Sequence, residues 1–321
     1  MLKNKLKNIY YKKRCKFSDF QIEKYQLMQE EQARALWAEA TPEVDALLLS
    51  HALEKGLSLD QPKKEFGEDK AEALIGILPK LNAKSYEYNV SMSILKEYLE
   101  TRAYHNEKIA TIEEAFVKLS KKKPYVSLPA GVGTTKLSDI MKKANIDFSS
   151  FIKTRHDIRK TSDEAISEKE ILKAIEMASL APSACNRQPW KIYYSLDEKQ
   201  NQKLGEIVSG NKAFKRDMKY YAAIVLDYKY FANRSDEFRQ IYLNAGIILS
   251  YFTLALHSLG IGSCIMQFTG LVEDADRKSR TILKLRDSEQ VMVVIGFGKY
   301  QKTVKYSKAA RRSAEEIAIK Y

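Results

Sequence analysis

The stretch Ala181-Pro-Ser-Ala-Cys-Asn-Arg-Gln-Pro-Trp190 constrains the fold more than any other part of this chain. It follows an amphipathic helical pattern and runs directly into the alternating apolar segment 190–194, so it must connect a helix to a strand. Pro182 and Pro189 each lack a backbone donor and restrict the backbone, which makes the turn rigid. The turn also carries a hydroxyl group and two side-chain amides close together, on Ser183, Asn186 and Gln188. The sequence therefore predicts a helix-to-strand loop that binds a planar ligand edged with carbonyl groups and ring nitrogens.

Length and composition indicate a soluble globular protein. The 321 residues suffice for one large domain or two medium ones. Hydrophobic residues make up 45% of the chain, but we find no run of about 18 apolar residues and no apolar signal-peptide core at the N-terminus. We therefore expect a cytoplasmic protein without stable membrane insertion. The three cysteines lie far apart with no CxxC pair, so neither a disulfide framework nor a zinc or other metal site is indicated.

A net charge of +13 raises the question of an acidic partner. Basic residues crowd the segment 3–16, with Tyr10 and Tyr11 between them, as in an arm that binds anionic lipid or nucleic acid. A solvated tail is the alternative, and we favour it. No zinc-finger, RNA-recognition or helix-turn-helix signature supports a nucleic-acid-binding protein, so we expect no nucleic acid partner.

The N-terminal part of the chain is typical of helices. Helical spacing recurs in four segments, 42–53, 69–78, 90–105 and 111–120, and no alternating strand pattern occurs among them. Lysine, proline and glycine are dense in the segment 121–135, as they are in linkers, so we place the domain boundary there. We expect an all-helical N-terminal region of unknown role over residues 1–135 and a second domain over residues 136–321.

The second domain mixes helices and strands. A Ser-x-x-Glu capping box at Ser167 begins the helix that leads into the loop. Apolar strands are predicted over residues 190–194, 221–227 and 290–298. Residues 237–259 predict a long helix whose apolar stripe is wide enough to be buried on more than one side. Such a helix belongs either to the core or to an interface between two copies of the chain.

Four stretches, in order, resemble motifs of the nitroreductase family, flavin-dependent oxidoreductases that bind FMN at a dimer interface. The loop is similar to the family's aPSxxNxQPW loop, and residues 155–159 resemble the RxSxR motif that opens its domain. Residues 259–268 resemble its LGLGSCW stretch, and residues 307–316 its closing KxxRxPxEE element, with Ser313 in place of proline. The resemblance implies an α+β, nitroreductase-like fold with a mainly antiparallel sheet flanked by helices, in a homodimer.

The resemblance also implies which residues bind FMN. Arg155 and His156 are expected near the phosphate, and Arg159 near the flavin pyrimidine ring, where it stabilises the reduced flavin and acts as the catalytic residue. Asp157 stands where the family usually has serine, so it must turn away from the phosphate or pair with an arginine. The remaining expected contacts are Pro182, Ser183, Ala184, Asn186, Gln188, Met266, Gln267, Arg311 and Arg312.

By this resemblance the chain is an FMN-dependent oxidoreductase. NAD(P)H would deliver hydride to the flavin, and an electron-poor acceptor such as a nitroaromatic, quinone or enone would then take it. The alternative is a flavin-binding scaffold with a helical protein-interaction region and little or no reductase activity. The sequence does not identify the physiological acceptor, the choice of NADH or NADPH, or the direction of the reaction.

Overall fold

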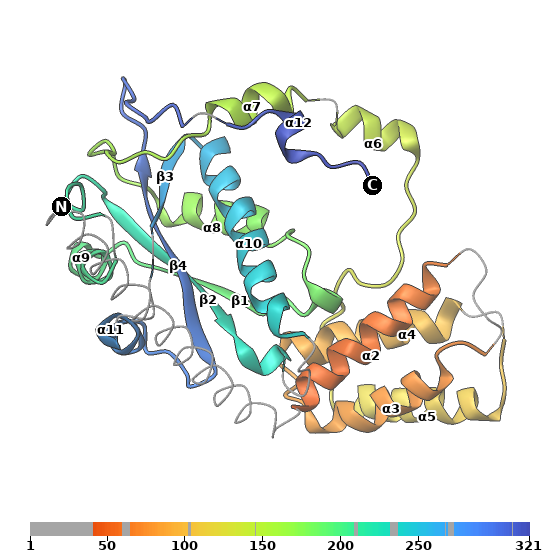
Figure 1. Cartoon of the computed structure of the whole chain (residues 1–321). Coiled ribbons are helices and arrows are strands. Elements are labelled where there is room, and N and C mark those ends of the chain that lie inside the picture. The colour runs from red at the N-terminus through yellow and green to blue at the C-terminus, as the bar shows by residue number, and fades with distance from the viewer. Residues whose placement is uncertain are drawn as a thin grey trace, which may run out of the picture.

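The structure, a computed structural model, describes residues 41–59, 65–101, 104–144, 146–208, 211–231, 237–266, 268, 273–309 and 311–321. A bundle of helices lies beside a sheet that is covered by further helices, and the two parts touch along one side (Figure 1). The basic segment 3–16 and Gln267 lie outside the described residues.

The N-terminal bundle contains α2 (Pro42–Leu57), α3 (Glu68–Ile77), the 3-10 turn η1 (Leu78–Lys80), α4 (Tyr86–Thr101) and α5 (Glu107–Lys122). Most residues of α4 are buried, so it is the central helix of the bundle. Its core includes Leu53, Leu74, Leu95 and Ile109. Burial of each such side chain contributes about 1.5–3 kcal/mol. The expectation of helices without strands holds for the described residues of this part, although α4 begins at Tyr86, before the predicted start at residue 90.

The sheet has the strand order β1-β2-β4-β3, and all three pairings are antiparallel. Its strands are β1 (Trp190–Tyr194), β2 (Tyr220–Asp227), β3 (Ile261–Met266) and β4 (Glu289–Lys299). Every residue of β2 is buried, because β1 and β4 flank it and helices cover both of its faces. The predicted strands appear within one residue of their expected ends, whereas β3 was not predicted as a strand.

Helices cover the two faces of the sheet. Alternate side chains of a strand point to opposite faces, so Ile224 of β2 packs with α8 (Glu168–Ala178) and α10 (Phe238–Ser258), while Val225 packs on the side of α9 (Glu198–Glu206) and α11 (Glu273–Leu283) (Figure 1). The capping box at Ser167 is confirmed, with the hydroxyl and the Glu170 carboxylate each accepting from the other residue's backbone N–H. The helix α11 has no counterpart among the predicted elements.

The long helix α10 crosses the first of these faces. Ile241, Ile248 and Phe252 are buried against the sheet, whereas Leu243 and Tyr251 are exposed on the outer side. By length and composition alone, α10 is long and apolar enough to cross a membrane, but core helices of soluble proteins meet the same criterion. The contacts of α10 with all four strands make it the helix on which this face of the sheet is built.

The segment between the bundle and the sheet forms an arm. It carries α6 (Leu137–Ala144) and α7 (Phe148–Thr154), and the C-terminal helix α12 (Ala314–Ile317) lies near α7 in Figure 1. Apolar side chains of the arm and of the C-terminal segment are exposed, among them Leu137, Phe148 and Ile317. The domain boundary at residue 135 stays a prediction.

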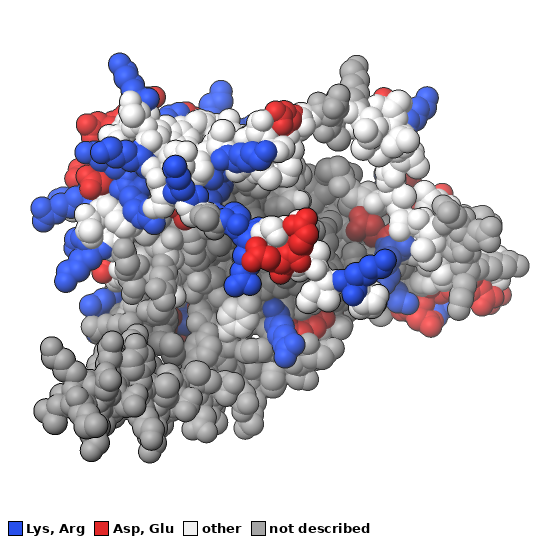
Figure 2. All heavy atoms as spheres, turned by 45° about the horizontal axis from the view of Figure 1, so that its top comes forward, with Lys and Arg blue, Asp and Glu red and all other residues white. Residues whose placement is uncertain are grey.

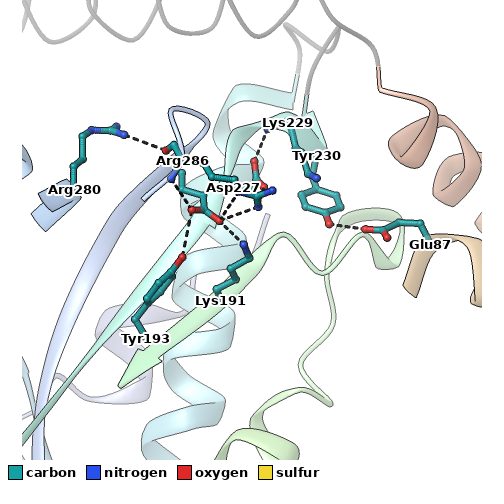
Figure 3. A network of polar contacts seen from close by, with 9 residues as sticks. Glu87, Lys191, Tyr193, Asp227, Lys229, Tyr230, Arg280 and Arg286 are labelled. Atoms are coloured by element: carbon teal, nitrogen blue, oxygen red, sulfur yellow. Dashed lines mark hydrogen bonds and ion pairs between the residues drawn. The ribbon is translucent and has the colours of Figure 1, made fainter. Parts of the chain in front are cut away.

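A buried carboxylate ties the end of β4 to its neighbours. Glu289 is 1% exposed and accepts hydrogen bonds from Lys191, from Tyr193 at 3.3 Å and from Arg286 at 2.9 Å (Figure 3). Arg286 also donates to Asp227 at 2.7 Å. Burial acts to raise the pKa of Glu289, but the donors Lys191 and Arg286 outweigh it and lower the pKa to about 2. The carboxylate therefore stays ionised in the folded protein.

Replacing this carboxylate by an amide should weaken the fold and its response to acid. The unfolded chain binds a proton near pH 4.5 and the folded protein only near pH 2, so stability is lost as the pH falls through this window. We expect Glu289→Gln to lower the free energy of unfolding by about 2 kcal/mol at pH 7 and to flatten this acid dependence. Urea unfolding at a series of pH values measures both effects, with the exposed Glu164→Gln as control. Parallel pH curves for wild type and Glu289→Gln would contradict the assignment.

Candidate functional site

Residues 155–159 lie along the outer edge of β3. Asp157 forms a parallel bridge with Ser263, and the backbone N–H of Ile158 donates to the Ser263 carbonyl at 2.9 Å. Gly262 makes this approach possible, because a Cβ atom there would lie 3.0 Å from Ile158 and 2.8 Å from the ring of Tyr300. Gly262 therefore leaves room for the segment beside β3.

The side chains of this segment meet the start of the closing element. Arg155 pairs with Asp157 at 3.3 Å, which is the pairing expected for the carboxylate that replaces serine. His156 stacks on Tyr306 with 3.6 Å between ring centroids. Arg159 donates to the hydroxyl of Ser307 at 3.1 Å, and its guanidinium lies over the ring of Phe214. Because the same segment also pairs with Ser263 of β3, the fold brings together three of the four motifs, of which the first and the last are about 150 positions apart in the sequence.

The C-terminal end of α10 supports this segment. The Nε2 of His257 lies 3.0 Å from the hydroxyl of Thr154, and its Nδ1 lies 2.8 Å from the hydroxyl of Tyr300. Burial lowers the pKa of His257, and the charges of Arg155 and His156 lower it further. Burial also raises the pKa of the Cys264 thiol to about 11. Cys264 therefore stays a protonated thiol near neutral pH. We call the group formed by Arg155, His156, Arg159 and His257 the basic end.

The loop 182–188 has a strained backbone held by hydrogen bonds. Cys185, Asn186 and Gln188 have φ angles of 50°, 51° and 46°, in the left-handed region that L-residues other than Asn and Asp rarely adopt. The hydroxyl of Ser183 accepts from the Gln188 N–H at 2.9 Å, and the side chain of Asn244 in α10 accepts from the Ala184 N–H at 3.1 Å. Pro182 is exposed and Cys185 half-buried. The loop, which contains η2 (Ala184–Asn186), is thus shaped by its own polar side chains and by α10.

Arg187 anchors this loop and is not among the site residues predicted from the sequence. Its side chain is fully buried and lies 2.6 Å from the carboxylate of Glu237, the residue that precedes α10. It also donates to the carbonyls of Ala184 at 3.0 Å and Tyr230 at 2.7 Å. Tyr230 belongs to the 3-10 turn η3 (Tyr228–Phe231). A lone charge inside a loop of small and amide residues was the signal that could have identified it, because a buried charge has to be paired.

The loop and the basic end lie at opposite ends of α10. The loop contacts Asn244 and Glu237 near its N-terminus, and the basic end surrounds His257 near its C-terminus. A helix of 21 residues is about 30 Å long, at about 1.5 Å per residue. Within one chain, the predicted FMN contacts therefore form two separate groups.

The remaining predicted contacts lie on β3 and in the C-terminal segment. Met266 is buried at the end of β3, three residues beyond Ser263. Arg311 and Arg312 are exposed, and Arg311 donates to the carbonyl of Ala309. Ser313, which replaces the proline of the resembling motif, caps α12 by accepting from the Glu316 N–H at 3.3 Å. The roles expected of these residues toward a flavin stay predictions.

Two surfaces flank these groups. Lys and Arg side chains gather over the end of the molecule where β3 and α7 lie, with fewer acidic residues among them (Figure 2). The outer face of α10 is apolar, and a shallow hollow there is lined by Tyr242, Leu243, Gly246, Ile247, Ser250 and Tyr251. A larger cleft of about 800 Å³ begins at Lys160, next to the basic end, and carries both basic and acidic side chains.

Several known structures and curated proteins that are similar to this chain carry the name nitroreductase. An FMN-dependent nitroreductase from Clostridium difficile R20291 is 24% identical, with a TM-score of 0.45, over 53% of this chain and 98% of that protein. A Desulfovibrio desulfuricans nitroreductase solved in complex with FMN is 20% identical, with a TM-score of 0.46, over 55% and 98%.

Among curated proteins, Spy0809 of Streptococcus pyogenes serotype M6, which carries the name NAD(P)H nitroreductase, is 34% identical over 80 residues. A protein of Archaeoglobus fulgidus that carries the name NADH dehydrogenase/NAD(P)H nitroreductase is 44% identical over 55 residues. The matches cover 25% and 17% of this chain and 40% and 32% of those proteins, so the chain spans less than half the length of either relative. The model of the nitroreductase family matches residues 152–216 and 200–299. The C-terminal half of the chain, from residue 152 to residue 299, is a nitroreductase-family domain.

Proposed function

We propose that this protein is an FMN-dependent oxidoreductase that passes hydride from NAD(P)H to a small electron-poor acceptor, as a homodimer in the cytoplasm. The position of the two groups of predicted contacts at opposite ends of α10 is the observation that carries the proposal. The exposed apolar side chains along α10 suit it to pair with α10 of a second copy. An antiparallel pairing brings the loop of one copy to the basic end of the other, so that each flavin site is shared.

The residues at the basic end suit a phosphate and an electron-rich ring. Arg155 and Arg159 supply forked donors that match a dianion or the edge of a pyrimidine ring. Asp157 is paired with Arg155 at 3.3 Å, so its charge is offset. The Ser183, Asn186 and Gln188 side chains of the loop supply the mixed donors and acceptors that a flavin edge needs.

The chemistry that FMN supplies when bound is the acceptance and release of hydride. The protein positions the reactants and sets the charge around them. Arg159 is exposed and held by Ser307, so its positive charge is available to stabilise negative charge on the pyrimidine side of the ligand. The strained loop presents its polar groups in one arrangement, because Arg187 and Asn244 hold its backbone. We propose nitroaromatics, quinones or enones as acceptors.

Absorbance of the purified protein tests the cofactor and the first half of the reaction. We expect flavin bands that bleach when NADH or NADPH is added without oxygen. Arg159→Ala should slow this reduction roughly 10–1,000-fold, since a single charge-stabilising donor contributes on this scale. Arg216→Ala removes an exposed arginine from the neighbouring segment and should reduce like wild type. A flavin-bound protein that NAD(P)H does not reduce would support the scaffold alternative, and a colourless one that takes up no FMN would refute both.

Sedimentation velocity tests the shared site. Leu243 is 56% exposed on the outer face of α10, and a charge placed there by Leu243→Glu would have to be buried in the paired interface. We expect a wild-type dimer and a monomeric Leu243→Glu variant that has lost its flavin. Val117→Glu makes the same change at a 48% exposed residue of α5 and should remain dimeric. A monomeric Leu243→Glu variant that retains FMN would show that one chain holds the whole site.

A further inference from the structure

The first two residues of α4 bring the helical bundle onto the loop and onto the turn beside it. The hydroxyl of Tyr86 accepts a hydrogen bond from the side-chain nitrogen of Gln188 at 2.7 Å. The carboxylate of Glu87 accepts one from the hydroxyl of Tyr230, also at 2.7 Å (Figure 3). Tyr230 packs against the cores of both the bundle and the sheet, and its backbone carbonyl accepts from Arg187. The bundle is therefore joined to the loop both directly and through η3.

The contact with Tyr86 sets the orientation of the Gln188 amide. The same nitrogen lies 3.2 Å from the side-chain oxygen of Asn186 and 3.4 Å from its backbone carbonyl. The backbone carbonyl of Asn186 only accepts, so the amide nitrogen turns toward it, and the Tyr86 hydroxyl then accepts from the same nitrogen and holds the side chain in this rotamer. The carbonyl oxygen of Gln188 consequently points away from Tyr86, where it can accept a hydrogen bond from a ligand.

The contact also holds a residue that is in an unfavourable backbone conformation. A left-handed φ costs a residue such as Gln188 roughly 1–2 kcal/mol, and such strain persists only where the surroundings hold it. Helix α2 also contacts η2, so a second helix of the bundle packs against the loop.

We propose that Tyr86 is a positioning residue for FMN, supplied by the helical bundle from outside the nitroreductase-family domain. It orients the Gln188 amide so that the carbonyl oxygen accepts from the flavin. The bundle is thereby a part of the cofactor site. This inference rests on the proposed function.

Fluorescence titration of the flavin-free protein with FMN tests the proposal. Tyr86→Phe keeps the ring and removes the acceptor, and it should raise the Kd for FMN about three- to tenfold, as expected for the loss of one hydrogen bond. Tyr98→Phe is the matched control, because the Tyr98 hydroxyl donates to the Phe66 carbonyl at 2.7 Å inside the bundle. It should leave the Kd unchanged.

A double-mutant cycle separates positioning from a general loss of structure. If Tyr86 acts through Gln188, Tyr86→Phe has no further effect on the Kd in a Gln188→Leu background. An undiminished effect in that background, or equal effects of Tyr86→Phe and Tyr98→Phe, would overturn the inference.

Hydrogen exchange of the flavin-free protein distinguishes failure of this inference from failure of the proposed function. We expect the backbone amides of residues 183–188 to exchange faster in Tyr86→Phe than in wild type or Tyr98→Phe. If the exchange rates are unchanged in Tyr86→Phe, Tyr86 does not hold the loop, whether or not FMN binds. If the wild-type protein takes up no FMN, the proposed function is refuted, and with it the cofactor role of Tyr86. Faster exchange in Tyr86→Phe would in that case still support the contact between Tyr86 and the loop.

Discussion

Packing of α10 across the sheet is the constraint on which the rest of the structure depends. The inner side of the helix closes the core with β2 and α8, through residues such as Ile248 and Phe252. Its N-terminal part receives the loop at Asn244, and its C-terminal part supports the basic end at His257. One rigid helix thus fixes the distance between the two groups of predicted contacts. At about 1.5 Å per residue, Asn244 and His257 lie about 20 Å apart along the helix, so the separation of the groups is a property of the core and not of flexible loops.

The polar groups at either end of α10 are held by different means. At the basic end, charges lie near the surface, and the arginines are kept in place by Asp157 and Ser307. In the loop, the charge of Arg187 is fully buried and is neutralised by Glu237. An exposed cation is available to a ligand, whereas a buried and paired one stabilises the shape of the backbone around it. The fold therefore separates residues suited to binding from residues suited to support.

The helical bundle has a core of its own and still makes specific polar contacts with the family domain. Glu87 meets Tyr230, and Tyr86 meets Gln188, at the one side where the two parts touch. Burial raises the pKa of Tyr230, and its hydrogen bond to Glu87 raises it further, so the phenol remains a neutral donor. Contacts of this kind have a preferred geometry, so they couple the placement of the bundle to the shape of the loop more strongly than apolar packing alone would.

The sequence by itself determined most of the elements and the family of the second domain. Helical spacing, the capping box at Ser167 and the apolar strands follow from local periodicity, which neighbouring residues carry. In β3, Gly262 and Ser263 interrupt the apolar residues, so the strand could not be recognised from alternation. The motif residues Arg155, Arg159 and Gln188 were likewise identifiable, because they stand at fixed spacings within short segments.

Only the tertiary structure decided how these segments stand relative to one another. It joined residues 155–159 to Tyr306 and Ser307, and it placed the loop at the far end of α10. It also paired the buried Arg187 with Glu237 and set Tyr86 against Gln188, and the local sequence identifies neither partner. The physical reason is that such pairings depend on which faces of helix and sheet are buried together, and this is a property of the whole chain.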